Sequence, residues 1–251
     1  MQRRFLQGFW KLTWLETKIF VREPMGFVGA LVMPLVVFIV LGRSFGAAKP
    51  VPTAELDVPF NAAIFAAVVI AISAVQSLVA IISIYREGGI LKRLRATPLS
   101  PVTILGAHVV VKLGFTLISL ALLVLAGRRL FPGVMQVNVF SFAAAVLLGT
   151  LSILSLGFVI ASVVPTARFA QPISAAVVYP MLALSGLFFP VDRLPRALKA
   201  LAYLLPTTHA VALLKGVWDG SGWSAHWVNA VALLVLFGAY TSLSTKVFRW
   251  E

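Results

Sequence analysis

Few residues of this chain have side chains that could do chemistry, and their arrangement excludes most catalytic classes. The sequence has no cysteine, no phosphate-binding loop of the form G-x-x-x-x-G-K-[ST], no H-E-x-x-H motif and no G-x-S-x-G motif. All eight acidic residues lie outside the long apolar runs: Glu16, Glu23, Glu55, Asp57, Glu87, Asp192, Asp219 and Glu251. Proton- and cation-coupled transporters and intramembrane enzymes generally need a carboxylate inside the membrane. If this chain transports, we therefore expect its energy source to lie on another chain.

His108 and Lys112 are the ionisable residues that lie nearest the interior of an apolar run. They are four residues apart, so a helix places them on one face. Two interpretations stay open. In the first, Lys112 extends toward the cytoplasmic interface along its own alkyl chain. In the second, it contacts a substrate or a lipid phosphate in the transport pathway.

The elements that must position these residues are long apolar helices. The 251 residues are 60% hydrophobic and only 12% charged, about half the charge of a soluble domain. A helix needs about 20 apolar residues to cross the hydrocarbon core. We therefore predict an all-α membrane protein with one transmembrane domain over residues 1–251 and six spans, at about 26–42, 60–84, 102–127, 140–164, 173–190 and 228–248.

Lysine and arginine predict the orientation of these spans. With both termini on one side, that side holds the larger set of basic residues in the shorter loops, although Arg128 and Arg129 fall on the other side. Such a bias marks the cytoplasmic side, so we expect a multi-pass protein of the cell membrane with both termini in the cytoplasm. The net charge of +13 is explained by these loops, and we expect no nucleic-acid partner.

Two shorter segments are predicted to lie along the membrane surface. Residues 4–22 form an amphipathic pattern with a basic stripe that includes Arg4, Lys11 and Lys18, which is typical of an interfacial helix in contact with lipid. Glu16 falls on the apolar face of this helix and needs a partner. Residues 191–227 contain two short helical patterns separated by Pro206, and we expect an outer re-entrant pair.

The loop after the second span is predicted to dock on a partner protein. Gly88 and Gly89 break the span, and a short helix follows over residues 90–96. Leu91 and Leu94 lie on one side of this helix, with Arg93 among the basic residues around them, and Pro98 follows shortly after. A solvated linker would not need to display two leucines, so the pattern favours a helix that inserts into a groove.

The same loop resembles the signature of the ABC-2 type permease family. It reads Arg-Glu-Gly-Gly-Ile-Leu-Lys-Arg-Leu-Arg-Ala-Thr-Pro-Leu-Ser over residues 86–100. A second similarity is Ser-Gly-Leu-Phe-Phe-Pro over residues 185–190, followed by two Leu-Pro pairs. The resemblance covers essentially the whole chain. One departure is Val-Pro-Phe-Asn at residues 58–61, where many relatives have Pro-Gly at the start of the second span.

This resemblance implies a permease that works with a separate dimer of ABC ATPase subunits. ATP and magnesium would bind to the ATPase, and this chain would carry no cofactor or metal and no catalytic residue. The coupling residues would be Arg86, Glu87, Gly88, Leu91, Arg93, Leu94 and Pro98, with residues 165–172 as a second, smaller contact. Glu87 would pair with a basic residue of the ATPase.

The resemblance also implies a pathway and a mechanism. Two permease copies, identical or related, would surround a central pathway that opens by alternating access. Phe188, Phe189 and Pro190 would help to close its outer end, and His108 and Lys112 are candidate pathway residues. The expected cargo is an amphipathic or drug-like compound, with a lipid-linked glycan or lipid as the alternative. An intramembrane enzyme and a purely structural anchor are more distant alternatives.

Overall fold

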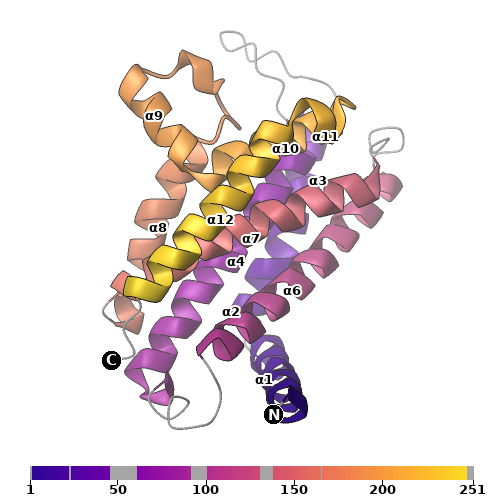
Figure 1. Ribbon diagram of the computed structural model, residues 1–251. Helices are drawn as coiled ribbons and strands as arrows, with labels where there is room; N and C mark the ends of the chain where they lie inside the picture. The colour runs from indigo at the N-terminus through magenta and orange to yellow at the C-terminus, as the bar shows by residue number, and fades with distance from the viewer. Residues whose placement is uncertain are drawn as a thin grey trace.

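Figure 1 shows the computed structural model of this chain as a bundle of long helices. The structure describes residues 2–22, 24–45, 61–91, 101–130, 138–164 and 166–247. Within these ranges all regular structure is helical. The helices in chain order are α1 (Gln2–Arg22), α2 (Pro24–Phe27), a π-helical turn (Val28–Val32), α3 (Met33–Phe45), α4 (Ala62–Glu87), α6 (Pro101–Leu130), α7 (Val139–Val163), α8 (Ala167–Ala183), a 3-10 turn (Val191–Arg193), α9 (Arg196–Leu204), α10 (Pro206–Trp218), α11 (Gly222–Ala225) and α12 (Trp227–Val247).

Four helices are long and apolar enough to cross a membrane, and they make this a multi-pass membrane protein. They comprise residues Ile64–Glu87, Gly106–Leu130, Val139–Val163 and Trp227–Val247, which confirms helices at the second, third, fourth and sixth predicted spans. Helices α9 and α10 form a pair bent by 81° that is apolar enough to count as a fifth span. The bend lies at Leu205, directly before Pro206, where the sequence predicts the break.

The fifth predicted span has the wrong bounds. A helix was expected over residues 173–190, but α8 covers Ala167–Ala183 and the chain then turns. Gly186 adopts φ +81°, the left-handed conformation that favours glycine. Lys215 of α10 donates a hydrogen bond to the Gly186 carbonyl oxygen over 2.6 Å. Hydropathy alone predicts that the helix continues here. The hydrogen bond from Lys215 instead stabilises a turn.

Asparagine side chains cap two of the spans at their N-terminal ends. Asn61 Oδ1 accepts the Ile64 N–H at 3.1 Å, and α4 begins at the next residue, Ala62. Asn138 Oδ1 accepts the N–H groups of Phe140 and Ser141, and α7 begins at Val139. These caps satisfy amide groups that the first turn of a helix leaves without partners. Although the sequence before α4 differs from the Pro-Gly of many relatives, Asn61 gives α4 a capped N-terminal end.

Helices α4 and α7 form the inner pair of the bundle. Of their apolar spans, 61% and 67% are buried, compared with 11% for α12. Helix α7 packs mainly against α12, α4 and α10, and α4 also packs against α8, α3 and α6. Because α4 contacts so many helices, its ends are well placed to bind several elements at once.

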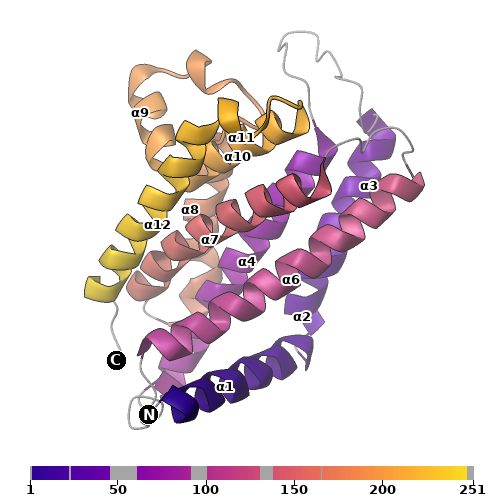
Figure 2. The same cartoon turned by 45° about the vertical axis from the view of Figure 1, so that its right-hand side comes forward.

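Helix α1 lies against the first half of α6, beside the long helices rather than among them (Figure 2). Phe9 and Leu12 pack on Ala107, while Phe20 packs on Val111 and Phe115. Helix α1 is described as far as Arg22, and α2 begins at Pro24. The start of α1, the ends of α4 and α12 and the start of α8 lie toward one end of the bundle, and α9 to α11 lie toward the other (Figures 1 and 2).

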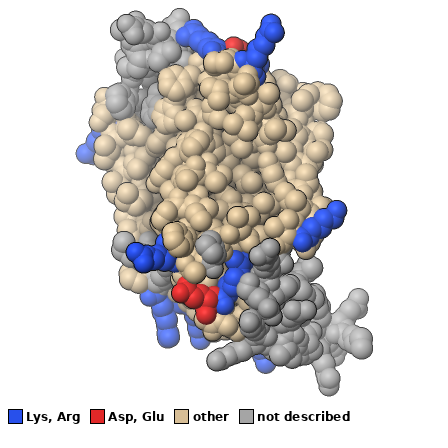
Figure 3. Space-filling view, turned by 90° about the vertical axis from the view of Figure 1, so that its left-hand side faces the viewer, with Lys and Arg blue, Asp and Glu red and all other residues tan. Residues whose placement is uncertain are grey.

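The distribution of charge on the surface fits a protein that crosses a membrane. On the face in Figure 3, lysine and arginine side chains gather toward the two ends, and a broad uncharged region separates them. The exposed side chains of α12 include Val228, Val231, Leu234 and Val235. A solvent-exposed helix of this kind would be unfavourable in water, whereas lipid accommodates it.

We predict that glycines on α7 are required for the close packing of the inner helices. A Cβ atom at Gly149 would lie 3.0 Å from the Ala210 Cβ, and one at Gly157 would lie 3.2 Å from Val75 Cγ1. Gly149→Val and Gly157→Val should each lower the stability of the purified chain by about 1–3 kcal/mol through overpacking. The midpoint of thermal unfolding in detergent measures this.

Gly238→Val is the matched control, because a Cβ atom there meets nothing within 4 Å. Its midpoint should stay close to that of the parent chain. An equal loss of stability at Gly238 would show that helix packing around α7 is not the cause.

Candidate functional site

The last turn of α4 ends at a glycine pair, as the sequence predicts. The Gly88 N–H bonds the Ile84 carbonyl oxygen at 2.9 Å, and the Gly89 N–H bonds the Arg86 carbonyl oxygen at 3.0 Å. Gly89 has φ +66°, a left-handed conformation that commonly terminates helices. The predicted coupling loop therefore begins directly after Tyr85, Arg86 and Glu87.

Arg86 caps the C-terminal end of α7. Its two terminal guanidinium nitrogens donate to the carbonyl oxygens of Val164, at 2.7 Å, and Ala161, at 2.9 Å. The last carbonyl groups of a helix have no partner within it and carry partial negative charge. A forked cation suits two such acceptors, so Arg86 binds α4 firmly to the end of α7.

Glu87 caps the N-terminal end of α8. Its Oε2 accepts the Ala167 N–H at 2.8 Å, and no cap hydrogen bond comes from the side chain of Thr166, which precedes α8. A carboxylate at this position also interacts favourably with the positive end of the helix dipole. The expected ion pair between Glu87 and a basic residue of the ATPase stays a prediction.

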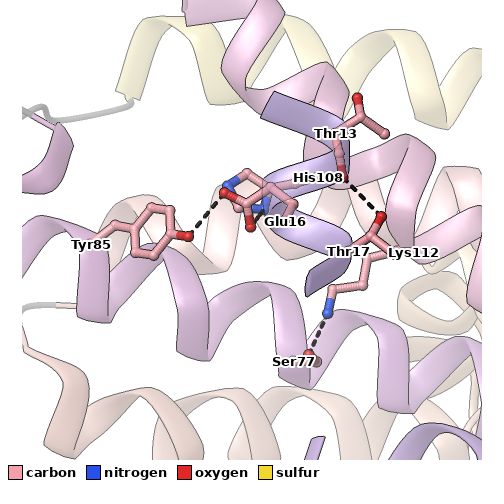
Figure 4. Close-up of polar contacts among 7 residues, drawn as sticks. All are labelled: Thr13, Glu16, Thr17, Ser77, Tyr85, His108 and Lys112. Carbon is pink, nitrogen blue, oxygen red and sulfur yellow. Dashed lines mark hydrogen bonds and ion pairs between the residues drawn. The ribbon is translucent and has the colours of Figure 1, made fainter. Parts of the chain in front are cut away.

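Tyr85 binds α4 to α1 through Glu16, which thereby gains the partner that the sequence leaves unnamed (Figure 4). The Tyr85 hydroxyl donates to Glu16 Oε1 at 2.9 Å. On the other side, His108 Nδ1 of α6 lies 3.3 Å from Glu16 Oε2. A single carboxylate of α1 thus contacts α4 and α6 through its two oxygens.

Burial raises the pKa of Glu16 above its ordinary value, and the Tyr85 hydrogen bond and the Lys112 charge act in the opposite direction. The side chains of Glu16 and His108 are 4% and 3% exposed. A His–carboxylate pair is also what an intramembrane enzyme would use, and here both side chains are largely buried. We interpret the pair as a packed contact between α1 and the spans.

Lys112 lies buried beneath α1. Its ammonium group donates to Ser77 Oγ at 2.5 Å and lies 4.0 Å from the ring centroid of Phe20. Because the side chain is 6% exposed, it does not extend to the surface as the first interpretation requires. Two adjoining hollows share Phe20, Ser77 and Lys112 in their walls.

The remaining predicted coupling and α1 residues differ in their surroundings. Leu91, predicted as a displayed side chain, is 1% exposed; this prediction is wrong because the chain buries this apolar side chain itself. Lys11 and Lys18 are exposed, and the Lys18 ammonium group lies 5.4 Å from the ring centroid of Trp14. Arg93, Leu94, Pro98 and the side chain of Arg4 lie outside the described residues.

The predicted gate residues lie in the turn after α8, at the opposite end of the bundle from Glu87. Phe188 packs edge-on against Phe65 of α4, with ring centroids 5.9 Å apart, and Phe189 lies 6.4 Å from Phe188. Both phenylalanines are partly exposed, and Pro190 precedes the 3-10 turn. They therefore form an aromatic group that is separate from the Glu16 contact.

A family model for the ABC-2 type transporter matches residues 7–217. The chain belongs to the ABC-2 type transporter family. Membership agrees with the long apolar helices of a multi-pass membrane protein. Residues 7–217 include the hydrogen bonds of Tyr85, Arg86 and Glu87 described above.

One curated relative matches a shorter region of this ABC-2 family member. Nodulation protein J of Rhizobium leguminosarum bv. viciae is 38% identical over 65 residues. The match covers 26% of this chain and 25% of the relative. The chain thus spans about a quarter of the curated relative that it matches.

Sequence analysis found Arg86, Glu87 and Glu16 but missed their partners. Tyr85 directly precedes the quoted loop and was given no role, and Val164 and Ala167 contribute backbone atoms that carry no sequence signal. One clue was available for Tyr85: an acid on an apolar helix face requires a donor, and tyrosine is a donor that membrane interfaces favour.

We predict that Tyr85 and Glu16 stabilise the chain as a pair. Tyr85→Phe and Glu16→Leu should each destabilise it by about 1–3 kcal/mol, because each leaves a buried polar partner unsatisfied. The double variant should lose less than the sum, with an interaction energy of about 0.5–3 kcal/mol. Chemical or thermal unfolding in detergent measures the stability of the two single variants and of the double variant.

Tyr240→Phe is the control for loss of a hydroxyl, because Tyr240 donates to the Leu204 carbonyl oxygen far from α1. Its effect should add to that of Glu16→Leu. Strict additivity between Tyr85→Phe and Glu16→Leu would contradict the proposed contact.

Proposed function

We propose that this chain is the membrane-spanning subunit of an ATP-driven ABC exporter, which moves an amphipathic or hydrophobic compound out of the cytoplasm by alternating access. The observation that carries this proposal is the family match over residues 7–217. The absence of a phosphate-binding loop in the 251 residues supports a separate ATPase that binds ATP and magnesium. The cell membrane, with both chain ends in the cytoplasm, is the proposed location.

The proposed architecture has six spans, α1 as an interfacial helix, and α9 and α10 as an outer re-entrant pair. Helix α8 has 17 residues and the apolar stretch Val28–Ser44 is of similar length, about 25 Å of helix. This length is close to the hydrocarbon thickness of about 30 Å, so both serve as short spans in the proposal. Exposed Trp10 and Trp14 flank the basic residues Lys11 and Lys18 on α1, which suits the headgroup region.

The proposed pathway lies between two copies of this permease or two related permeases. The hollows beside Lys112 each enclose about 10 Å³, far less than the roughly 300–1,000 Å³ of a typical drug-sized pocket. On α8, the exposed residues Gln171 and Tyr179 form a more polar face than lipid favours. A second copy would cover such a face, and Phe188 and Phe189 would close the outer end of the pathway.

The proposed ATPase contacts are residues 88–100 and the turn between α7 and α8. We expect Leu94→Asp to abolish copurification of this chain with its partner ABC ATPase, because a charge would occupy an apolar groove. Coexpression and affinity purification in detergent, followed by the rate of ATP hydrolysis, measure this. Reconstituted vesicles then report ATP-dependent movement of an amphipathic dye.

Leu198→Asp is the control, since Leu198 is exposed on α9 at the other end of the bundle. It should leave ATPase binding unchanged. Binding that survives Leu94→Asp would refute docking through this loop. Transport of a lipid-linked glycan but not of dyes would favour the alternative cargo.

A further inference from the structure

Three consecutive residues at the end of α4 bind three different helices. The Tyr85 hydroxyl reaches Glu16 of α1, the Arg86 guanidinium reaches the end of α7, and the Glu87 carboxylate reaches the start of α8. Successive side chains on a helix point about 100° apart. Neighbours in sequence can therefore contact elements on three sides, and the last turn of α4 does so immediately before the predicted coupling loop.

We propose that Tyr85, Arg86 and Glu87 form a junction that distributes the movement of the coupling loop to α1, α7 and α8. We call these three residues the α4 junction. This inference rests on the proposed function, because it assumes that residues 88–100 dock on an ATPase. The three side chains act as positioning residues, and none of them needs to touch the ATPase or the cargo.

The junction also joins the two proposed ATPase contacts to each other. Arg86 binds the Val164 carbonyl oxygen and Glu87 binds the Ala167 N–H, so the two bonds enclose the short turn between α7 and α8. The coupling loop begins directly after Glu87, and the second contact begins directly after Val164. A displacement of either loop is therefore transmitted to the other through two short hydrogen bonds, since packed helices move as units.

Two substitutions of Glu87 distinguish this junction from an ion pair between Glu87 and the ATPase. The junction needs an oxygen that accepts the Ala167 N–H, which glutamine also supplies. An ion pair needs the negative charge, which glutamine lacks. Glu87→Gln should therefore behave like the parent chain if the junction is correct, and Glu87→Ala should not.

The first test uses this permease alone in lipid nanodiscs, so its outcome does not depend on any ATPase. Amide hydrogen exchange of the Ala167 N–H should become roughly threefold to tenfold faster in Glu87→Ala, as expected for the loss of one hydrogen bond. Glu87→Gln should stay within about twofold of the parent chain. Asp192→Ala is the control: this exposed acid binds Lys199 at the opposite end of the bundle. Unchanged exchange in Glu87→Ala would overturn the junction.

The second test uses the permease in complex with its partner ABC ATPase and measures dye transported per ATP hydrolysed. Glu87→Ala should lower this ratio by at least about threefold while the complex stays assembled, and Glu87→Gln should retain most of it. Equal losses in the two variants would overturn the junction in favour of an ion pair. If no ATPase binds the parent chain, the proposed function fails, and the exchange result still decides whether Glu87 holds α8.

Discussion

The termini of membrane helices leave backbone groups without partners, and in or near lipid those groups must find a partner within the protein. Much of the described polar structure meets this requirement. Asn61 and Asn138 cap their own helices, whereas Arg86 and Glu87 cap α7 and α8 from α4. Lys215 of α10 likewise stabilises the turn after α8. Polar side chains at the ends of helices thus form several of the hydrogen bonds that connect one helix to another.

The buried carboxylate of Glu16 imposes a second constraint, because a charge removed from water needs several partners. Its two oxygens contact Tyr85 and His108, and Lys112 lies close enough to lower its pKa. Helix α1 can satisfy this carboxylate at only one rotation and height on α6. A contact of apolar residues alone would permit sliding, so Glu16 specifies the position of α1 beside the ends of α4 and α6.

These two constraints meet at one place in the chain. Tyr85 donates a hydrogen bond to the buried carboxylate of Glu16, and the next two residues cap the ends of α7 and α8. Gly88 and Gly89 then end α4, and the loop that carries the family signature follows. A membrane subunit driven by a separate ATPase needs a stiff connection between its docking loop and its spans, and hydrogen bonds to three helices supply such a connection.

The sequence by itself determined the helical membrane class, four of the long spans, the break at Gly88 and Gly89, the division of residues 191–227 at Pro206, and the family. These features follow from local composition: apolar runs, helix-breaking residues and a short motif. Only the tertiary structure decided the end of α8, the burial of Leu91, and the partners of Glu16, Arg86 and Glu87. The reason is physical. Lys215 binds Gly186 from another helix, and Arg86 and Glu87 bind backbone groups about 80 residues away. Every residue carries such backbone groups, so the sequence does not indicate which of them will be bound.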